Sequence, residues 1–591
     1  MLPRFLVLAN GTDVFPSLGP DIAARMRSID PGMQIHVWGS TMVAVAGSPV
    51  IPLEQGIIIG ALVDRRYPQT LSSLPEREKQ AIRQSRGLHL ISSYWGGYVA
   101  IIGSADGKSV DIVRAPFGEL PCYHKRYGQA TLLASDMDML VLAGIARPPV
   151  AWSAVAHELA WQDIRTDETC LEGISALQMG HRLTIGEGLG RVEQLWSPWD
   201  HVMDRHGSAA EESERIRQST GHCIGARASH YDRVLLMLSG GIDSSIVAAG
   251  LHASGNDYRL VTLVTRDRHG DERDFGRLMA QAVGQPLHEA LRDVRRIDPD
   301  HTDAARLPRP AKRMFEQESA RIAIEQARSV GAQAIFSGGG GDNVYCGLHS
   351  AAPVADRLLT GGVGREMFRA ARHLSDMAGV SIAAVVRSAL KLSLPWNRTG
   401  AFKPDLSYLS RDAAALASAT PAHPWFVRPR QGLPGKMRHI KLLSYAQSYI
   451  DGLDPQMPMP MIAPLLGQPL VEACLSIPTW RWFEDGKNRM VARRAFAREL
   501  PPQIAERRSK GTTDSFTGEI FERHHARLRE ILMDGLLAAQ GILDRNAIEG
   551  SFRSTGTVAP PDTGRLLRLI DVETWARAWH GGGAGITATN G

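Results

Sequence analysis

The sequence is poor in cysteine and has no long uninterrupted apolar run. Its 591 residues contain an odd number of widely separated cysteines, without a CxxC spacing: Cys122, Cys170, Cys223, Cys346 and Cys474. This pattern argues against a disulfide framework and a structural zinc site, and it predicts a reducing, cytoplasmic environment. The apolar stretch at 51–63 is interrupted by Glu54 and Gln55, and no membrane span is therefore expected.

The chain also lacks a strong excess of charge of either sign. Lys and Arg outnumber Asp and Glu by 67 to 62, and the sequence has one local basic cluster, RLPRPAKR at 306–313. Nucleic-acid binding needs basic charge concentrated on one surface, and so no nucleic-acid partner is predicted. The cluster is interpreted either as solvated surface or as a contact for a phosphate or an acidic peptide.

The pattern of apolar runs predicts two domains, at 1–205 and 206–591. In the first, short runs separated by Gly, Asp and Pro predict strands in layered antiparallel sheets at 5–9, 35–39, 42–47, 98–103, 110–115 and 130–135. In the second, predicted strands at 232–238, 258–264 and 332–337 alternate with helices, which is typical of a parallel α/β sheet. Beyond residue 350 the sequence is mainly helical in pattern.

The stretch LMLSGGIDSSIVAAG, at 236–250, predicts an anion site. The strand ends at Leu238, and Gly240 and Gly241 allow a tight turn that brings the backbone close to a ligand. Backbone N–H groups of such a turn and of the following helix N-terminus bind phosphates, and serine hydroxyls add donors. We therefore predict a nucleotide site that includes Leu238, Ser239, Gly240, Gly241, Asp243 and Ser244.

A second glycine-rich turn follows a later strand, in AIFSGGGGDNVYCG at 334–347. Ligands of parallel sheets bind at the carboxyl ends of strands, which predicts that Ser337 and Gly338 join the nucleotide site. An aspartate in an anion site requires a cation between it and the phosphates, and so we predict that Asp243 and Asp342 chelate one Mg²⁺. The histidines show no HExxH pattern, and no other metal site is predicted.

The first turn is not the GxxxxGK[ST] loop of phosphoryl-transfer NTPases. It resembles SGGxDS, the pyrophosphate loop of the N-type ATP pyrophosphatases. This resemblance implies that ATP is cleaved between its α and β phosphates, that a carboxylate becomes an acyl-adenylate, and that pyrophosphate leaves. It does not identify the substrate, because several synthetase families share the loop.

Further motifs extend the resemblance to the asparagine synthetase family, to about residue 575. The synthetase half shows SGGIDSS, SGGGGDN, APLLGQPLVEACLSIP, KNRMVARRAF and RRSKG, and the N-terminal half shows GGYVAIIG, RAPFGELPCY, ASDMD and CLEGISALQMGHRLTIG. The family's fold is a β-rich, Ntn-hydrolase-like sandwich domain followed by an N-type ATP pyrophosphatase α/β domain with a helical C-terminal region. The cofactors implied are ATP and Mg²⁺.

The resemblance also implies residues that stabilise the adenylate and the departing pyrophosphate. When KNRMVARRAF is aligned on Arg493, Arg489 takes the place of the family's lysine, with Lys487 two residues away; either serves this role or lies on a helix surface. Lys510, in RRSKG, is a third catalytic candidate. Val264, at the end of the second strand, is included in the nucleotide site.

Other residues have two open interpretations. Asp271, Glu272 and Asp274 either face the nucleotide or a substrate amine, or form a solvated helix N-terminus. Met457, Met459 and Met461 either line an adaptable peptide site or pack in the core.

Three departures from the family pattern shape the expected function. The family's glutaminase nucleophile is a cysteine at position 2, where this sequence has Leu2 followed by Pro3, and we expect no glutamine hydrolysis by that mechanism. In the second turn, the family's glutamate or tyrosine is Gly339, and its following glutamate is Asn343. These changes are expected to open the acyl site, and they leave the general base unidentified.

The family members that use the substrate's own amine include the lasso-peptide macrolactam synthetases, which the sequence resembles most. A lasso-peptide cyclase is therefore expected, with a processed precursor peptide as substrate and a leader peptidase and a leader-binding protein as partners. An ammonia-dependent asparagine synthetase, a β-lactam-type amide synthetase and a non-catalytic scaffold remain as alternatives. Retention of both Asp243 and Asp342 argues against the scaffold.

Overall fold

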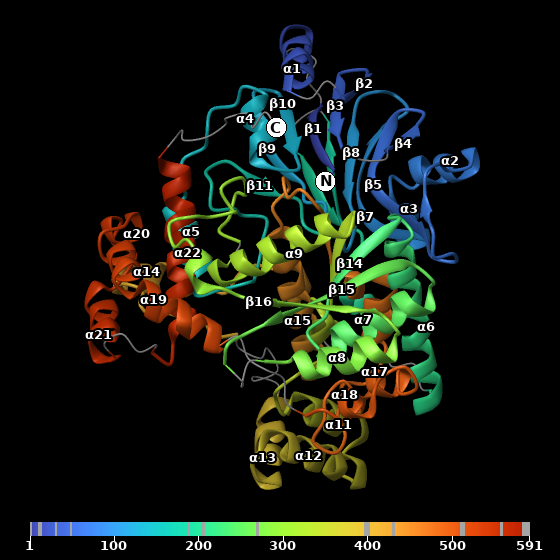
Figure 1. The fold of residues 1–591 in the computed structure, drawn as a ribbon. Coiled ribbons are helices and arrows are strands. Elements are labelled where there is room, and N and C mark those ends of the chain that lie inside the picture. The colour runs from blue at the N-terminus through green and yellow to red at the C-terminus, as the bar shows by residue number, and fades with distance from the viewer. Residues whose placement is uncertain are drawn as a thin grey trace.

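Two antiparallel sheets and one parallel sheet form the framework of the protein. The structure is a computed structural model that describes residues 3–9, 15–29, 32–47, 50–186, 190–202, 207–267, 271–311, 313–394, 402–427, 429, 432–508, 514–555 and 560–581. The two antiparallel sheets lie at the top of Figure 1, and the parallel sheet lies below them. Among the described residues, no helix is both long and apolar enough to cross a membrane.

The N-terminal part is a sandwich of two antiparallel sheets. One has the strand order β11-β9-β10-β1-β3-β2, and the other has the order β13-β12-β8-β7-β5-β4, with β6 beside β5. The strands of the first are β1 (Arg4–Ala9), β2 (Gln34–Trp38), β3 (Thr41–Ala46), β9 (Tyr123–Tyr127), β10 (Ala130–Ala134) and β11 (Ser175–Ala176). Those of the second are β4 (Val50–Leu53), β5 (Gly56–Asp64), β6 (Thr70–Leu71), β7 (Tyr94–Gly103), β8 (Val110–Arg114), β12 (His181–Ile185) and β13 (Arg191–Gln194).

Alternating apolar residues build the core between these two sheets. Phe5 and Val7 of β1 pack against Ile57 and Ile59 of β5 in one buried cluster. The residues between them point the other way, because successive side chains of a strand face opposite sides of a sheet. The predicted layered antiparallel sheets are confirmed, and the stretch at 51–63 forms the β4–β5 hairpin.

Helices cover the outer faces and edges of the sandwich. They are α1 (Phe15–Ile29), α2 (Glu76–Gln84), α3 (Leu88–Ser93), α4 (Met137–Leu142) and α5 (Trp152–Ala160). The sandwich ends at β13, and α6 (Ala209–Ala228) opens the second part with a Ser208–Glu211 capping box. The predicted boundary after residue 205 falls within 203–206, outside the described residues, and it stays a prediction.

The second part is built on a parallel sheet of order β16-β15-β14-β17-β18. Its strands are β14 (Arg233–Met237), β15 (Asp257–Val264), β16 (Leu287–Leu291), β17 (Ala334–Ser337) and β18 (Met461–Ile462). Leu235 of β14 packs under α9 (Gln317–Ser329). Val234 and Leu236 face α7 (Ile242–Ala253) and α8 (Arg273–Ala282) on the opposite side. The parallel α/β sheet is therefore confirmed.

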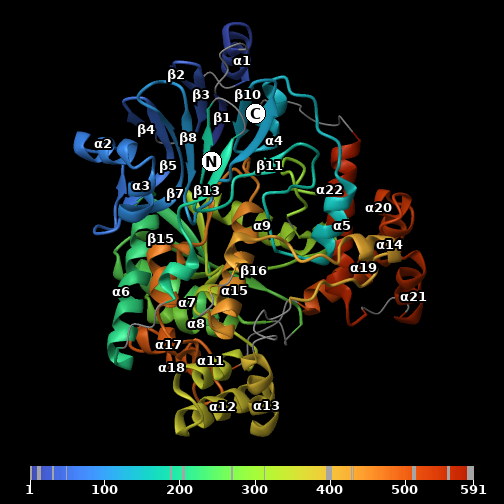
Figure 2. The ribbon, with the colours of Figure 1, turned by 180° about the vertical axis from the view of Figure 1, so that it is seen from behind.

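Helices dominate the remainder of the chain, as the sequence predicts. Figure 2 shows α11–α13 projecting from the end of the molecule opposite the sandwich, and α19–α22 gathered along one side. The helices are α10 (Gly341–Val344), α11 (Ala352–Gly361), α12 (Arg365–Ala378), α13 (Ile382–Ser393), α14 (Arg411–Leu416), α15 (Pro434–Asp451), α16 (Gln468–Leu475), α17 (Met490–Ala495), α18 (Pro502–Ala505), α19 (Asp514–Met533), α20 (Leu536–Ala539), α21 (Arg545–Thr555) and α22 (Thr563–His580). In the parallel sheet, the sequence interpretation missed the polar β16 and the two-residue β18, which lies in a proline- and methionine-rich segment.

The two parts share buried cores and buried ion pairs. Arg114 of β8 pairs with Asp451 at the end of α15, and it also donates to the backbone oxygens of Leu120 and Leu177. Arg114 is 2% exposed and Asp451 is 6% exposed. Because a buried charge is costly without its partner, this pair locks the sandwich onto the helix that flanks the parallel sheet.

Asp451→Ala should lower the free energy of unfolding by roughly 3–5 kcal/mol, because it leaves the Arg114 guanidinium buried without its counter-ion. The matched control is Asp257→Ala, whose partner Arg233 lies at the surface, and it should change stability by at most about 1 kcal/mol. Urea unfolding of both variants measures the difference. Equal losses would contradict the interdomain role of the buried pair.

Candidate active site

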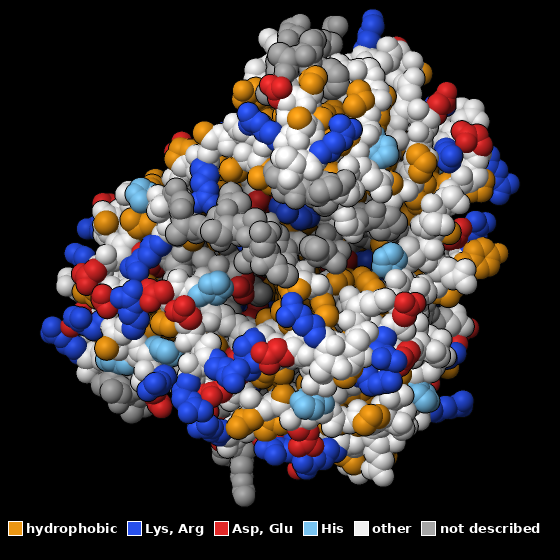
Figure 3. Space-filling view, turned by 45° about the horizontal axis from the view of Figure 1, so that its top comes forward, with side chains coloured by type: hydrophobic (Ala, Val, Ile, Leu, Met, Phe, Trp, Pro, Cys, Tyr) orange, Lys and Arg blue, Asp and Glu red, His pale blue; other side chains and the backbone are white. Residues whose placement is uncertain are grey.

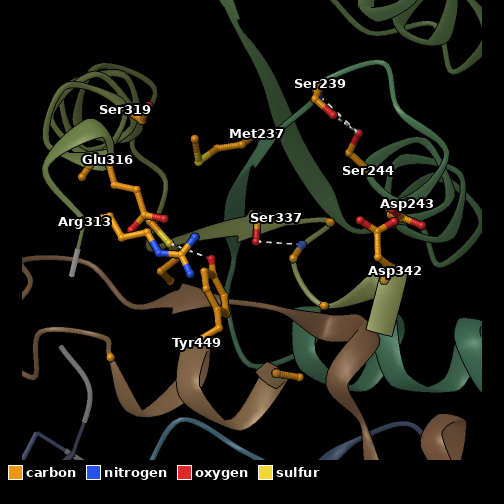
Figure 4. Close-up of a pocket in the computed structure, with 18 of the residues that line it drawn as sticks. Met237, Ser239, Asp243, Ser244, Arg313, Glu316, Ser319, Ser337, Asp342 and Tyr449 are labelled. Atoms are coloured by element: carbon orange, nitrogen blue, oxygen red, sulfur yellow. Dashed lines mark hydrogen bonds between the residues drawn. The ribbon is translucent and has the colours of Figure 1, made fainter. Parts of the chain in front are cut away.

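A cavity of about 650 Å³ lies at the carboxyl ends of β14 and β17. Both glycine-rich turns line it, together with residues from β15, α9, α15 and the segment before α9. The position agrees with the general rule for parallel sheets. In Figure 4, Ser239, Ser244, Asp243 and Asp342 lie on one side, called here the phosphate end, and Arg313, Glu316, Ser319 and Tyr449 lie on the other.

The first turn is held in shape by its own serines. β14 ends at Met237, α7 begins at Ile242, and the hydroxyls of Ser239 and Ser244 lie 3.1 Å apart. The Ser239 backbone N–H donates to the Ser244 hydroxyl, which donates in turn to the Gly241 oxygen. The N-terminus of α7 therefore faces the cavity with hydroxyl and N–H groups nearby, which is the arrangement that binds phosphate.

The second turn packs directly against the first. A Cβ atom at Gly338 would lie 2.5 Å from the Ser244 backbone nitrogen, and one at Gly341 would lie 2.5 Å from the Asp243 carboxyl carbon. No side chain fits at either position unless the two strand ends move apart. The glycines are therefore what brings Asp243 and Asp342 to one place.

One arginine contacts both aspartates. Arg489 Nη1 lies 2.6 Å from Asp243 Oδ2 and also contacts Asp342 Oδ1. Burial lowers the pKa of the guanidinium, but the two carboxylates more than offset it, and the net pKa is raised. Arg489 adopts a left-handed backbone conformation, with φ 58°, which costs free energy in a non-glycine residue and occurs most often at functional sites.

The two carboxylates suit a magnesium ion. Asp342 exposes 59% of its side chain and Asp243 exposes 8%. One carboxylate of the pair is therefore buried, and the other is accessible from the cavity. Mg²⁺ is commonly held by one or two carboxylates together with substrate phosphates, and the described residues contain no cluster of three or more acidic, His or Cys side chains that could hold a metal. Asp243 and Asp342 would hold the ion, which neutralises phosphate charge when bound.

The other predicted nucleotide residues divide into two groups. Leu238, Ser239, Gly241, Ser244, Ser337 and Gly338 line the cavity. Gly240 and Val264 do not line the cavity. A Cβ atom at Gly240 would lie 2.5 Å from the Cβ of Phe275, and Gly240 has a positive φ. Packing and backbone conformation therefore both favour glycine at this position.

The predicted cationic residues also differ in position. Arg489 is at the phosphate end, whereas Lys487 pairs with Glu506 and does not line the cavity. Lys510 lies outside the described residues. Arg507, also in RRSKG, donates to Glu272 at 2.6 Å and to the Gly240 oxygen at 3.3 Å. Of the acidic group near residue 272, Glu272 lines the cavity, and Met457 and Met461 line it as well.

Gly339 does not leave open space, contrary to the expectation from the sequence. A Cβ atom there would lie 3.2 Å from Cε1 of Tyr449 and 3.1 Å from the Ser337 hydroxyl. Tyr449 comes from α15 and thus places a phenol beside the glycine. Burial, with the nearby Glu316 charge, raises the pKa of Tyr449 to about 12, so that at neutral pH the phenol is a hydrogen-bond donor and not a base.

Three arginines of the basic cluster at 306–313 pair with acidic residues of the sandwich domain. Arg306 pairs with Asp138, Arg309 with Glu158, and Arg313 with Asp163, all three partners belonging to the sandwich domain. On the face shown in Figure 3, basic and acidic side chains lie next to one another. The cluster therefore joins the domains.

Comparison with known proteins assigns the family. The model of asparagine synthase matches residues 215–577, more than half of the chain, and that of a glutamine amidotransferase domain matches residues 80–196. The chain belongs to the asparagine synthase family. It is therefore an ATP-dependent carbon–nitrogen ligase, and the expected fold of an amidotransferase-type sandwich followed by the synthase domain is confirmed.

Solved structures give weaker similarities. A glutamine phosphoribosylpyrophosphate amidotransferase from B. subtilis, complexed with ADP and GMP, aligns at 10% identity over 49% of this chain and 81% of its own, with a TM-score of 0.20. The allosteric regulatory enzyme of purine biosynthesis aligns at 11% identity over 57% and 83%, also with a TM-score of 0.20. No curated protein matches the chain.

The amidotransferase-type domain of this asparagine synthase family member buries its first cysteine. Cys122 has no exposed surface, and burial raises the pKa of its thiol to about 12. Because the thiolate is the nucleophilic form, Cys122 does not perform amide hydrolysis.

Gly338→Ala should abolish ATP–pyrophosphate exchange and destabilise the protein, because the added methyl group would force the two turns apart. Gly221→Ala is the control: it lies in α6 with no atom within 4 Å of an added Cβ, and it should stabilise the protein by roughly 0.5–1 kcal/mol through helix propensity. Full exchange activity in Gly338→Ala would show that the close packing of the turns is unnecessary.

Proposed function

We propose that this enzyme is a lasso-peptide cyclase. A side-chain carboxylate of Asp or Glu in a processed precursor peptide attacks the α-phosphorus of ATP, the bond to the β-phosphate breaks, and pyrophosphate leaves. The peptide's N-terminal amine then attacks the acyl carbon, the bond to AMP breaks, and the amine loses a proton as the macrolactam forms. ATP and Mg²⁺ are the cofactors of this proposal.

The observation that carries the proposal is the second half of the cavity. It extends away from the phosphate turns to a wall that includes Asp163 from the sandwich domain, Arg313 and Tyr449. The whole cavity, of about 650 Å³, lies in the middle of the range for small-ligand sites. A wall assembled from both domains, with charged groups far from the phosphates, supports a substrate larger than a free amino acid.

Energetics make a pre-organised site necessary for this reaction. Threading the peptide before closure costs conformational entropy, about 1–2 kcal/mol for each residue fixed. Holding the amine against the adenylate lowers the barrier by as much as roughly 7–11 kcal/mol through proximity. The cavity wall contains residues of both domains, and the buried Arg114–Asp451 pair holds the two domains in a fixed relative position. The wall therefore supports this requirement.

The pathway implied by the proposal includes other proteins. A leader peptidase would expose the amine, and a leader-binding protein would deliver the precursor; both would act with this enzyme in the cytoplasm. The amine comes from the peptide and not from glutamine, in agreement with the inert Cys122 thiol.

A β-lactam-type small-molecule amide synthetase is the second candidate. It is favoured by Tyr449, whose ring lies beside Gly339, where relatives that act on small substrates carry a bulky residue. An ammonia-dependent asparagine synthetase is the third candidate, and exchange with free aspartate and ammonia distinguishes it from the cyclase.

ATP–pyrophosphate exchange with Mg²⁺ should occur with linear peptides that have an N-terminal glycine and an acidic residue at position 7, 8 or 9. The product should be lighter than the peptide by one water, measured by mass spectrometry. A mixture of free aspartate and ammonia should give no exchange, and exchange with it would return the enzyme to asparagine synthesis.

A further inference from the structure

Helices α12 and α13 form a hairpin at the end of the molecule opposite the sandwich (Figures 1 and 2). Three residues, at 379–381, join the two helices, which pack against each other and against α11. Met367 and Leu374 of α12 are buried, as are Val385 and Ala389 of α13. The hairpin is therefore attached to the protein by one face, and its other faces meet solvent.

The solvent-facing sides of this hairpin carry large apolar side chains. Phe368 of α12 is 50% exposed and Leu390 of α13 is 49% exposed. Six exposed large apolar residues belong to the hairpin and its ends, namely Val363, Phe368, Val380, Ile382, Leu390 and Leu394. Single residues of this kind are normal on a protein surface, whereas several gathered together indicate an interaction site.

The hairpin also carries five basic side chains, which are Arg365, Arg369, Arg372, Arg387 and Lys391. Among the residues that the structure describes, none of these five forms an ion pair or a side-chain hydrogen bond. The acidic residues of the two helices are Glu366, which pairs with Arg357 of α11, and Asp376. Burial lowers the pKa of His373, which contacts Asp485 and is neutral at neutral pH. The hairpin therefore presents a net positive charge.

Basic and apolar side chains are neighbours on both helices. Phe368 follows Arg365 by three residues and precedes Arg372 by four, which are the spacings of neighbours on a helix surface. On α13, Ile382 and Leu390 share one side, because they are eight residues apart. The exposed Lys391 follows directly after Leu390.

This mixture of charge and apolar surface matches a membrane surface that contains anionic lipid. Its headgroups attract Lys and Arg, and the boundary with the acyl chains accepts apolar side chains that lie between them. A second copy of the chain is a poorer partner, because a symmetric interface would place the same positive surface on both sides. Lipids also adapt to apolar side chains that stand apart from one another, and no shaped pocket is needed.

We propose that the α12–α13 hairpin docks on a membrane surface rich in anionic phospholipid. Phe368, Ile382 and Leu390 enter the interface, and the five basic side chains contact headgroup phosphates. The enzyme is then a peripheral membrane protein, held by one end and without a spanning helix. The inference concerns where the enzyme acts, and it does not depend on the identity of the substrate.

Cosedimentation of the full chain with lipid vesicles measures this docking. The wild type should bind vesicles made of phosphatidylcholine and phosphatidylglycerol in equal parts, and it should bind vesicles of phosphatidylcholine alone far more weakly. Added salt should weaken the binding to the anionic vesicles, because it screens exposed charges.

Two double variants test the two parts of the surface. Arg387→Ala with Lys391→Ala should weaken binding to anionic vesicles by roughly twentyfold or more, because each cation near such a surface contributes about fivefold. Ile382→Ser with Leu390→Ser should weaken it by about tenfold or more, through the loss of buried apolar area. All four side chains are exposed, and circular dichroism should give the unfolding midpoint of the wild type for both variants.

The matched controls remove the same kinds of side chain elsewhere. Leu416 lies on α14, apart from the hairpin in Figure 1, and is 67% exposed; Arg328 is an exposed residue of α9. Leu416→Ser and Arg328→Ala should both bind vesicles as the wild type does.

Four results would overturn the proposal. They are no binding of the wild type to anionic vesicles, equal binding to both kinds of vesicle, and full binding by both double variants. The fourth is a wild-type dimer in sedimentation velocity that Ile382→Ser with Leu390→Ser dissociates, since the hairpin would then be an interface between copies of the chain.

Discussion

The site depends on holding two carboxylates of like charge side by side at the ends of neighbouring strands. Asp243 and Asp342 repel each other, and the repulsion is strong where protein replaces water. Arg489 offsets it by contacting both carboxylates. The glycines at 338 and 341 allow the approach, since any side chain there would separate the turns. The order of the strands, the packing of the two turns and the contacts of Arg489 therefore act together to hold the two aspartates side by side.

The same arrangement of two carboxylates and one guanidinium suits the binding of Mg²⁺ and phosphates. Asp243 and Asp342 would hold a magnesium ion, which would neutralise phosphate charge. Arg489, which contacts both aspartates, would add positive charge where negative charge develops as pyrophosphate leaves. Arg489 has a left-handed backbone, φ 58°, at the N-terminus of α17, and its side chain reaches Asp243 and Asp342.

The sandwich domain contributes to the cavity wall, while its Cys122 and Cys170 are buried. It supplies Asp163 to the cavity wall, where Asp163 pairs with Arg313 in the segment before α9. The buried Arg114–Asp451 pair fixes it to α15, the helix that carries Tyr449. Because the sandwich domain contributes residues to the cavity of the second domain, loss of its fold would disrupt that cavity.

Local sequence was sufficient to predict the turns but not the far wall. SGGIDSS and SGGGGDN contain the glycines and aspartates whose spacing dictates the phosphate end, and apolar runs located strands in each of the three sheets. Tyr449 and Glu316 carried no local signal, because a helix residue and a loop residue reach the cavity only through long-range packing. The arginines of the basic cluster at 306–313 were interpreted as solvated surface or an anion contact, because a sequence does not show acidic partners more than a hundred residues away.

The sequence also left the choice between Lys487 and Arg489 open. Both residues precede α17 in an irregular segment, where spacing in the sequence does not tell which side chain faces the site. In the structure the two side chains lie in different places: Arg489 contacts Asp243, and Lys487 pairs with Glu506.

Calorimetric titration of ATP into wild-type protein and Asp342→Asn, each with and without Mg²⁺, tests the paired-carboxylate site most directly. The wild type should bind ATP more tightly with Mg²⁺, and the variant should lose more than about tenfold of that gain, since even outer-shell partners of a metal contribute this much. An Asp342→Asn variant that keeps the full Mg²⁺ effect would contradict the account.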